Sequence, residues 1–322
     1  MKVLVVGAGI IGTIFGWALA EDGHDVTHFV RKGKAGNFPH GAQIDMLENR
    51  KGKKNFIGRY DIKLAEVLSP SDGFEVVIVP TKPYQLMDVL KEIVPQTGNA
   101  DYLLLTQNWT GTAEIDAVLP QARYIFGDAH AGGVWKDGVL IATIMDDIIL
   151  GQVDRGRGAV LQKFADLFTG INLKVTIPEN ILHYIWVQHA MTTGLWMGLV
   201  RTGSLENILK DPVNGPLSLQ AVKECLTVAE KRGIDLQKYP EIKMYLQTGS
   251  KIGMAITGFV VRMMFKLNKS IQRSSAHGLG DPIEIRSAYE DLLKSGAEFG
   301  VPMPIMQSFR PDVERLVAIG VH

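Results

Sequence analysis

The stretch KVLVVGAGIIGTIFGWALAEDG, residues 2–23, decides the fold of the chain's first half. Residues 2–6 are a short β-branched, apolar run, which is typical of a buried strand. Apolar residues then recur at helical spacing from Ile11 to Leu19, and the pattern stops at Gly23, a residue type that often follows the end of a helix. A glycine-rich turn therefore joins a strand directly to a helix.

The turn between this strand and this helix reads GAGIIG, residues 7–12. Its G-x-G-x-x-G spacing is weak by itself, but here it stands where a dinucleotide-binding turn needs it. The first glycine makes the tight turn, the second lets the backbone approach a pyrophosphate, and the third lets helix and strand pack closely. The N-terminus of the helix faces the anion. The motif predicts cofactor-binding positions at Gly7, Gly9, Ile10, Ile11 and Gly12.

Strand and helix patterns continue to alternate after this unit. Such alternation predicts a parallel sheet with right-handed crossovers, the doubly wound α/β arrangement of a Rossmann-type domain. Residues 133–151 read as one or two hairpins, which we expect to extend the sheet in antiparallel fashion. The further strand-like runs are residues 25–30, 75–80, 102–107 and 124–129, and helical patterns follow the second and third of them.

The second half of the chain has a helical pattern almost throughout. Pro178 marks a boundary, and Asn180 is placed to cap the first helix. We therefore predict a Rossmann-type cofactor domain over residues 1–178 and an all-helical substrate or dimerisation domain over residues 179–322. The long helical patterns cover residues 180–200, 216–232, 240–267 and 282–299.

Composition excludes several classes of partner. The chain has 34 Lys and Arg against 34 Asp and Glu, so no overall field favours nucleic acid or a membrane surface. The most apolar later run, residues 252–265, is interrupted by Arg262 and is shorter than the roughly 20 residues that span a bilayer. No signal peptide is visible, and the single cysteine, Cys225, fits a reducing compartment. We expect a cytoplasmic protein that binds neither nucleic acid nor a membrane.

Cations follow the second strand, where a dinucleotide site selects its cofactor. Arg31, Lys32 and Lys34 come directly after it, and no acidic residue lies between His28 and Asn37. An NAD-specific site would place an Asp or Glu here to accept from the ribose 2′-hydroxyl, whereas a guanidinium suits a 2′-phosphate. The pattern predicts NADP(H), although a solvated basic loop would give the same residues.

Polar residues also follow two further strands at their carboxyl ends, the edge at which an open sheet of this class binds its ligand. Lys82 and Gln85 follow the strand at 75–80, and Asn108 follows the strand at 102–107. Each alone could be an ordinary loop residue. Together they indicate a ligand site along this edge.

With these residues assembled, the chain resembles the ketopantoate reductase family of NADP-dependent dehydrogenases over nearly its whole length. The resemblance rests on the glycine motif with its helix, Arg31, the K-x-x-Q of Lys82 and Gln85, the N-x-x-G of Asn108 and Gly111, the His130-Ala131 segment, the helix containing IWVQHAM, and the IEI of residues 283–285.

The resemblance implies roles for several of these residues. It implies that Arg31, Lys82 and Gln85 hold the cofactor. It also implies that Asn108 lies beside the nicotinamide ribose and the substrate, and that Glu284 binds the substrate and orients a catalytic lysine. It leaves a homodimer open and predicts no metal site.

That lysine is the main departure from the family pattern. Aligning Trp186 with the family's tryptophan puts Gln188 at the position of the lysine, the general acid, and Thr192 at an asparagine one turn later. A neutral amide donates a hydrogen bond but does not titrate usefully, so Gln188 cannot protonate an alkoxide. A further family asparagine falls at Trp196, and Trp109 replaces a usual glycine, which should crowd the cleft.

Several groups are candidates for the missing proton donor. Tyr184 shares the helix face of Gln188, whereas His189 is turned about 100° round the helix and is expected to face packing. Burial of Glu284 without a cationic partner would favour its protonated form. The remaining candidates are His130, His277 and a water held by Glu284 and Thr192.

Three functions remain open. The favoured one is an NADP(H)-dependent oxidoreductase of this family acting on a small-molecule substrate other than ketopantoate, a larger carbonyl, imine or alkene compound, with 2-dehydropantoate 2-reductase proper as an alternative. Large side chains at Trp109, Trp196, Met197 and residues 252–265 favour a bulkier substrate, unless they are packing residues. The second function is a catalytically silent NADP-binding protein. The third is an opine-type dehydrogenase, which relies on a His–Asp pair, and no such pair stands out in the sequence.

Overall fold

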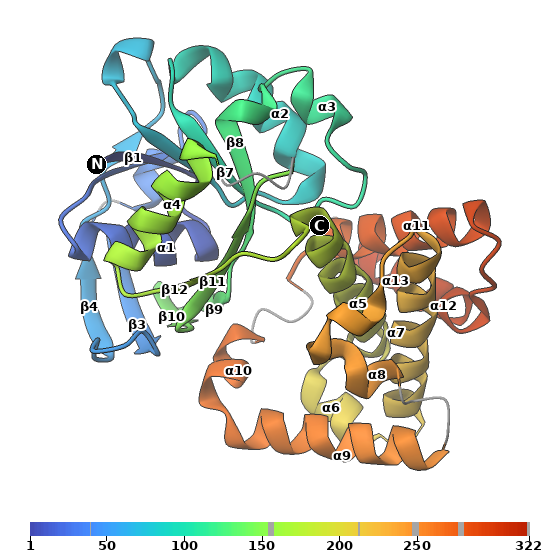
Figure 1. The fold of residues 1–322 in the computed structure, drawn as a ribbon. Helices are drawn as coiled ribbons and strands as arrows, with labels where there is room; N and C mark the ends of the chain where they lie inside the picture. Colours follow the sequence, from blue (N-terminus) through green and yellow to red (C-terminus); the bar gives the residue numbers. More distant parts are fainter. Residues whose placement is uncertain (39, 154–157, 212, 247–250, 276–279, 321–322) are drawn as a thin grey trace. The chain divides into compact units, whose positions relative to one another are not determined.

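The computed structural model describes residues 1–38, 40–153, 158–211, 213–246, 251–275 and 280–320. The chain divides into two compact units, residues 1–182 and 183–322 (Figure 1). The first unit contains every strand that the described residues form, and the second is helical.

The first unit is built on an eight-stranded sheet with the order β12-β11-β8-β7-β6-β1-β2-β5. Six neighbouring strands, from β8 to β5, are parallel, which confirms the doubly wound class. Only β11 pairs antiparallel, with β8, and it carries β12 beside it in parallel. The strands are β1 (Lys2–Val6), β2 (Asp25–Phe29), β5 (Leu64–Ala65), β6 (Val76–Val79), β7 (Asp101–Leu105), β8 (Tyr124–Asp128), β11 (Asp147–Gly151) and β12 (Lys174–Thr176).

A second sheet of four strands has the order β4-β3-β10-β9. It corrects the expectation that all of residues 133–151 extend the main sheet, because only β11 does so. The hairpin of β9 (Ala131–Lys136) and β10 (Val139–Ile144) instead pairs along β10 with β3 (Ala42–Glu48). Strand β4 (Phe56–Tyr60) closes the other edge. Buried positions along β3 alternate with more exposed ones, as expected for a strand with one face against the core.

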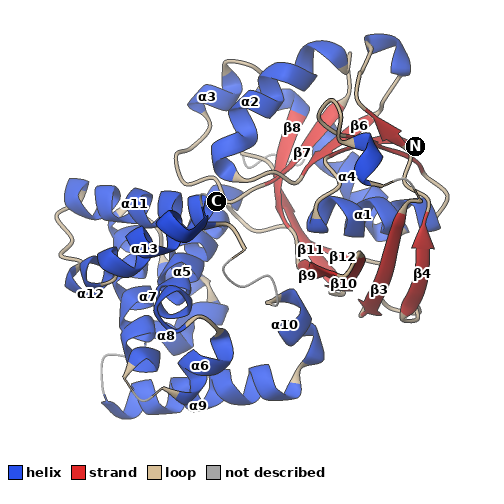
Figure 2. Ribbon diagram, turned by 180° about the vertical axis from the view of Figure 1, so that it is seen from behind, coloured by secondary structure: helices blue, strands red, loops and turns tan. Residues whose placement is uncertain are grey.

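Helix α1 (Ile10–Glu21) lies between the two sheets and is buried over most of its length (Figure 2). Helix α4 (Ala159–Gly170) packs beside it, with the rings of Phe15 and Phe168 in edge contact at 5.6 Å. Helices α2 (Pro83–Ile93) and α3 (Ala113–Asp116) cover the opposite face of the main sheet (Figures 1 and 2).

The second unit is a bundle of helices, as the sequence predicts. Asn180 precedes the first helix, and its side chain accepts a hydrogen bond from the N–H of Leu182 at 3.1 Å, which confirms the predicted cap. The pattern predicted over 240–267 contains the helices Lys243–Leu246 and Lys251–Leu267, and residues 247–250 between them lie outside the described residues. The helices are α5 (Ile181–Thr202), α6 (Leu205–Lys210), α7 (Asn214–Lys231), α8 (Lys243–Leu246), α9 (Lys251–Leu267), α10 (Lys269–Ser274), α11 (Pro282–Glu298), α12 (Pro304–Ser308) and α13 (Arg310–Gly320).

Helices of the described residues are too short or too polar to cross a bilayer. The apolar stretch that begins α9 therefore does not form a spanning segment, as its interruption by Arg262 predicts.

Candidate functional site

The glycine turn has the geometry that a dinucleotide site needs. Gly7 adopts a left-handed backbone conformation with φ 86°, and its N–H donates to the carbonyl of Phe29 at 2.7 Å. Nothing lies within 4 Å of the place where a Cβ on Gly9 would stand, so a ligand can approach the backbone there. A Cβ on Gly12 would lie 2.9 Å from the carbonyl oxygen of Gly7. The third glycine is therefore required by packing and the second leaves room for a ligand.

A buried histidine, His28, contacts the backbone of this turn. Nδ1 of His28 lies 2.9 Å from the carbonyl oxygen of Gly7, and Nε2 lies 3.1 Å from the hydroxyl of Tyr60. Burial lowers the pKa of His28 to about 4, so the ring is neutral at pH 7. Since a carbonyl only accepts, Nδ1 carries the proton and Nε2 accepts from Tyr60. A Cβ on Gly16 would stand 2.2 Å from Nε2, so the ring also explains that glycine.

Beside the glycine turn lies a cleft of about 820 Å³. Three stretches of the first unit line it: residues 6–9, residues 29–38 and residues 80–92. Its cationic lining residues are Arg31, Lys34 and Lys82. Its lining also includes two acids, Asp88 and Glu92, and apolar and polar residues, among them Phe29, Val30, Phe38, Pro80, Val89, Tyr84, Asn37 and Gln85. Apolar walls with a few converging cations suit a nucleotide with its phosphates.

Helix α2 places two of the predicted residues in this cleft. Lys82 is the residue before the helix, and Gln85 lies in its first turn, where its N–H donates to the carbonyl of Lys82 at 3.0 Å. Five other predicted cofactor residues do not line the cleft: Ile10, Ile11, Gly12, Lys32 and Asn108. Ile10 and Ile11 pack against the hydrophobic core, and Lys32 is exposed beside the cleft.

Asn108 closes its own loop at the carboxyl end of β7. Its Nδ2 donates to the carbonyl of Gly111 at 2.5 Å, and its Oδ1 accepts from the N–H of Gly111 at 3.1 Å. The side chain of Asn108 is buried, and so is that of Trp109. The N-x-x-G spacing is thus explained locally, because the amide side chain pairs with the peptide group of a glycine held at φ 94°.

A His–Asp pair stands at the carboxyl end of the next strand. Nδ1 of His130 lies 2.7 Å from a carboxylate oxygen of Asp147, and Asp128 lies 3.7 Å from Nε2. This pair could not be predicted from the sequence, because it forms between strands that are distant along the chain. Ile149 pairs with Asp128 in the antiparallel register of β8 and β11, and this register sets Asp147 opposite His130.

In the second unit, helix α5 presents the predicted polar face. Tyr184, Gln188 and Thr192 follow one another at four-residue spacing, and all three are half-buried. His189 is 3% exposed, and burial together with nearby Arg232 lowers its pKa to about 3. His189 is therefore a neutral packing residue at pH 7, as predicted, and not the proton donor.

Glu284 lies in the first turn of α11, and its N–H donates to the side chain of Asp281 at 3.1 Å. His277, another candidate, falls outside the described residues.

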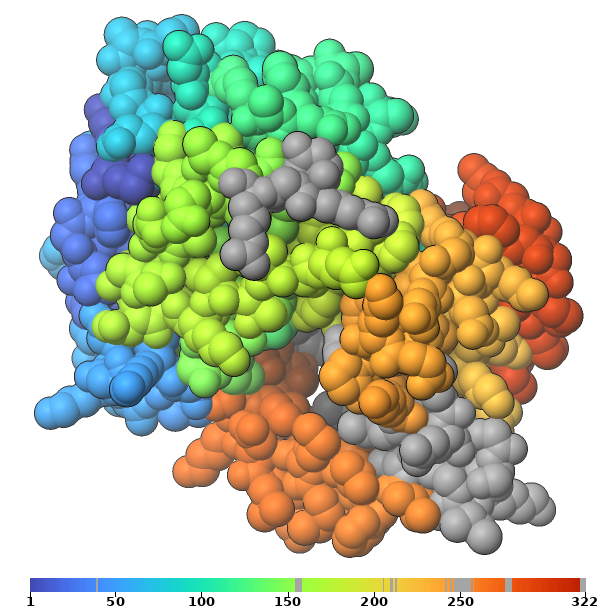
Figure 3. Space-filling view, viewed as in Figure 1, coloured from blue at the N-terminus to red at the C-terminus, as the bar shows by residue number. Residues whose placement is uncertain are grey.

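The large side chains that favour a bulkier substrate, unless they are packing residues, differ in burial. Met197 is fully buried and belongs to the core of the second unit, whereas Trp196 is half-buried. In α9, Phe259 is 63% exposed and Met264 is 47% exposed, and Figure 3 shows this helix at the surface in orange. The side chain of Met254 falls outside the described residues. Met197 is thus a packing residue, the alternative that the sequence left open.

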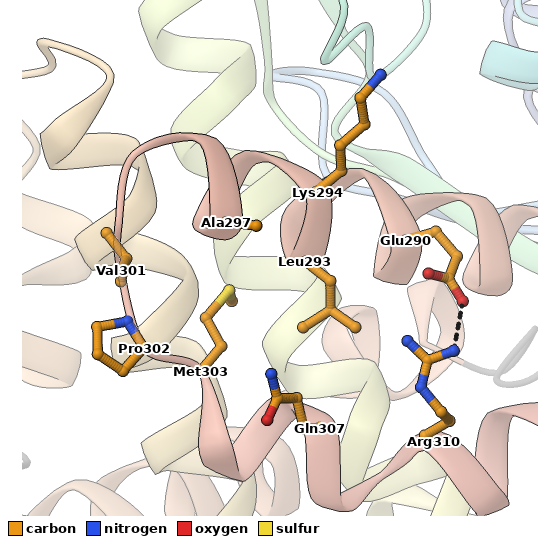
Figure 4. A pocket seen from close by; sticks show the side chains of 9 residues that line it. All are labelled: Glu290, Leu293, Lys294, Ala297, Val301, Pro302, Met303, Gln307 and Arg310. Carbon is orange, nitrogen blue, oxygen red and sulfur yellow. Dashed lines mark hydrogen bonds and ion pairs between the residues drawn. The ribbon is translucent and has the colours of Figure 1, made fainter.

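A second hollow, of about 630 Å³, lies on the second unit among α11, α12 and α13. Figure 4 shows its lining, in which Glu290 pairs with Arg310 at 3.2 Å. Lys294, Met303 and Gln307 also line it, and the predicted site residues do not. This hollow is therefore separate from the site that the sequence predicts.

Comparison with known proteins agrees with this geometry. Residues 3–155 match the family model described as Ketopantoate reductase PanE/ApbA. The chain carries a ketopantoate reductase family domain. The 2-dehydropantoate 2-reductase of Pyrococcus abyssi is 26% identical over 259 residues, which cover 77% of this chain and 80% of that protein.

Solved structures share the fold of the ketopantoate reductase family domain together with the helical unit. The 2-dehydropantoate 2-reductase of Geobacter metallireducens GS-15 superposes with a TM-score of 0.73 at 17% identity, over 98% of this chain and 99% of that one. A D-mandelate dehydrogenase in complex with NADH superposes with a TM-score of 0.70 at 20% identity, over 98% of both chains. The predicted fold class, a Rossmann-type domain followed by helices, is confirmed.

The ketopantoate reductase family is a family of oxidoreductases. Three features of the domain that matches it in this chain were not predicted from the sequence. They are the brace of His28, the His130–Asp147 pair and the wall that Asn37 and Phe38 add to the cleft. A polar residue inside an otherwise apolar strand, as His28 is, was the one available signal. Within the described residues, no group of three or more His, Cys, Asp or Glu could hold a metal ion.

Proposed function

We propose that this chain is an NADP(H)-dependent reductase whose substrate is a carbonyl, imine or alkene compound other than ketopantoate. The observation that carries the proposal is the single cleft in which an open glycine turn meets Arg31, Lys34 and Lys82. The backbone at Gly9 leaves space for a pyrophosphate, and the cations supply the charge that a 2′-phosphate needs. NADP(H), when bound, supplies the hydride.

The departure at Gln188 supports a substrate other than ketopantoate. Reduction of a ketone needs a proton as well as a hydride, and a neutral amide cannot supply it. An iminium arrives already protonated, and the enolate formed from a conjugated alkene can take its proton from water. Such substrates relax the demand for a strong acid at position 188.

For a carbonyl substrate, the structure favours His130 as the proton donor. The ring is oriented by Asp147 at 2.7 Å, and it follows β8, the direct neighbour of the strand that leads to Asn108. An imidazole oriented by a carboxylate through one nitrogen can act as a general acid through the other. A protein that only bound the cofactor would have no need for an oriented imidazole at this edge.

A deuterium-transfer screen tests the proposal. The protein is incubated with NADPH deuterated at C4 on either face and with panels of 2-oxo acids, aldehydes, imines and enones. We expect deuterium in at least one product, and the loss of this transfer in Arg31→Ala at low cofactor concentration. Lys91→Ala is the matched control, because Lys91 is an exposed cation on α2 that does not line the cleft. Tight NADPH binding without transfer to any compound would instead support a silent NADP-binding protein.

A further inference from the structure

Glu66 is an acidic residue at the same sheet edge as the basic loop, immediately after β5. Strand β5 pairs in parallel with β2, with Phe29 opposite Ala65, and the N–H of Val30 donates to the carbonyl of Ala65 at 2.9 Å. The segments that follow β2 and β5 therefore leave the sheet side by side. This pairing brings the carboxylate of Glu66 against the loop that carries Arg31.

The contacts of Glu66 are with the backbone of that loop. Its Oε1 accepts from the N–H of Ala35 at 2.8 Å. Hydrogen bonding to the loop backbone, first to Ala35 and then to Gly33 and Lys34, lowers the pKa of Glu66, with Lys32 adding a smaller electrostatic contribution. The N–H of Lys34 itself donates to the carbonyl of Arg31 at 2.9 Å. Gly33 has φ 80°, a conformation that turns successive amides toward one anion.

The loop held in this way carries the cations that line the cleft. Arg31 and Lys34 face the cleft, whereas Glu66 is not among the residues that line it. The carboxylate therefore holds the loop from outside the cleft. Without it, the N–H of Ala35 would have to find another partner and the loop would lose a contact that fixes its turn.

We propose that Glu66 is a positioning residue that preorganises the Arg31–Lys34 loop for the 2′-phosphate of NADPH. This assignment rests on the proposed function. The rival role for an acid at this edge is to accept a hydrogen bond from the ribose 2′-hydroxyl of NADH. The carboxylate is already engaged by the backbone of the loop at Ala35 and does not line the cleft, and both observations oppose that rival role.

Two substitutions separate these roles. Glu66→Ala removes the acceptor, whereas Glu66→Gln keeps a side-chain oxygen for the amides and removes only the charge. Ordering even one loop residue costs enough free energy that Glu66→Ala should weaken NADPH binding about tenfold in isothermal titration. NADH, which does not need the loop, should lose less than threefold, and Glu66→Gln should recover most of the NADPH affinity.

A second readout follows the loop without cofactor. Trypsin should cut after Arg31, Lys32 or Lys34 faster in Glu66→Ala than in the wild type, and NADPH should protect both proteins. Glu114→Ala is the control, because Glu114 is an exposed acid on α3 in the same unit.

Each outcome bears on the assignment. If the wild type prefers NADPH over NADH and Glu66→Ala binds NADPH with unchanged affinity, the role of Glu66 is overturned but the proposed function is not. If both Glu66 variants bind NADH and NADPH more weakly to the same extent, the positioning role is overturned in favour of recognition of the ribose. A wild type that binds neither nucleotide overturns the proposed function and the role of Glu66 with it.

Discussion

Replacement of His28 by asparagine should remove an acid-dependent loss of stability from the first unit. Burial lowers the pKa of this ring to about 4 in the folded protein, against 6.5 for an ordinary imidazole. The folded state therefore resists a proton that the unfolded chain accepts. Stability is unaffected well above pH 6.5 and falls as the pH drops through 6.5 towards 4.

The size of this loss follows from the two pKa values, 6.5 in the unfolded chain and about 4 in the folded one. Each pH unit between them is worth about 1.4 kcal/mol, so the whole loss is about 3 kcal/mol. Between about pH 7.5 and about pH 5 the wild type should lose about 2 kcal/mol through this group.

The assay is urea unfolding of wild type and His28→Asn at these two pH values. Asparagine can still donate to the carbonyl of Gly7 but cannot titrate. We expect the variant to have a lower free energy of unfolding than the wild type at the higher pH, and this difference between the two proteins to narrow by about 2 kcal/mol at the lower pH. Other groups titrate equally in both proteins and cancel. His40→Asn, at an exposed position, should not change the slope. A gap that stays constant with pH would refute the reasoning.

Three further predictions concern the site. Gly9→Ala should leave the melting temperature nearly unchanged but weaken NADPH binding at least about tenfold, whereas Gly12→Ala, with its Cβ 2.9 Å from a carbonyl oxygen, should destabilise the free protein by about 1–3 kcal/mol in thermal melts. The wild type should reduce ketopantoate at least about a thousandfold more slowly than a lysine-bearing relative, and Gln188→Lys should raise that rate; ordinary wild-type turnover would contradict the role given to this position. His130→Asn and Asp147→Asn should each lower kcat on a carbonyl substrate by about 10²–10⁴ and alter the pH–rate profile, and unchanged profiles would exclude the pair.

The parts of the fold set by neighbouring residues could be predicted from the sequence. The order of β1, glycine turn and α1 depends on residues within one short stretch, and so does the cap of α5 by Asn180. The positions of Arg31, Lys82 and Gln85 in one cleft follow from a rule of parallel sheets, that strand carboxyl ends share an edge.

The parts that depend on pairing between distant segments could not be predicted. Strand β10 looks like an extension of the main sheet until β3, about a hundred residues earlier, is known to be its partner. The His130–Asp147 pair depends on the antiparallel register of β8 and β11. Burial decides other cases, since Met197 and Trp196 are adjacent in the sequence but only the first is fully buried.

Isothermal titration of the wild type with NADPH and NADH tests the central claim most directly, that the cleft beside the glycine turn recognises a 2′-phosphate. The result is not fixed by the fold, since a D-mandelate dehydrogenase of similar structure was solved with NADH. We predict that NADPH binds at least about tenfold more tightly than NADH, because a charge-assisted contact is worth more than 1.4 kcal/mol. Arg31→Ala should abolish most of that difference while Lys91→Ala preserves it. Equal affinities for the two nucleotides in the wild type would contradict the claim.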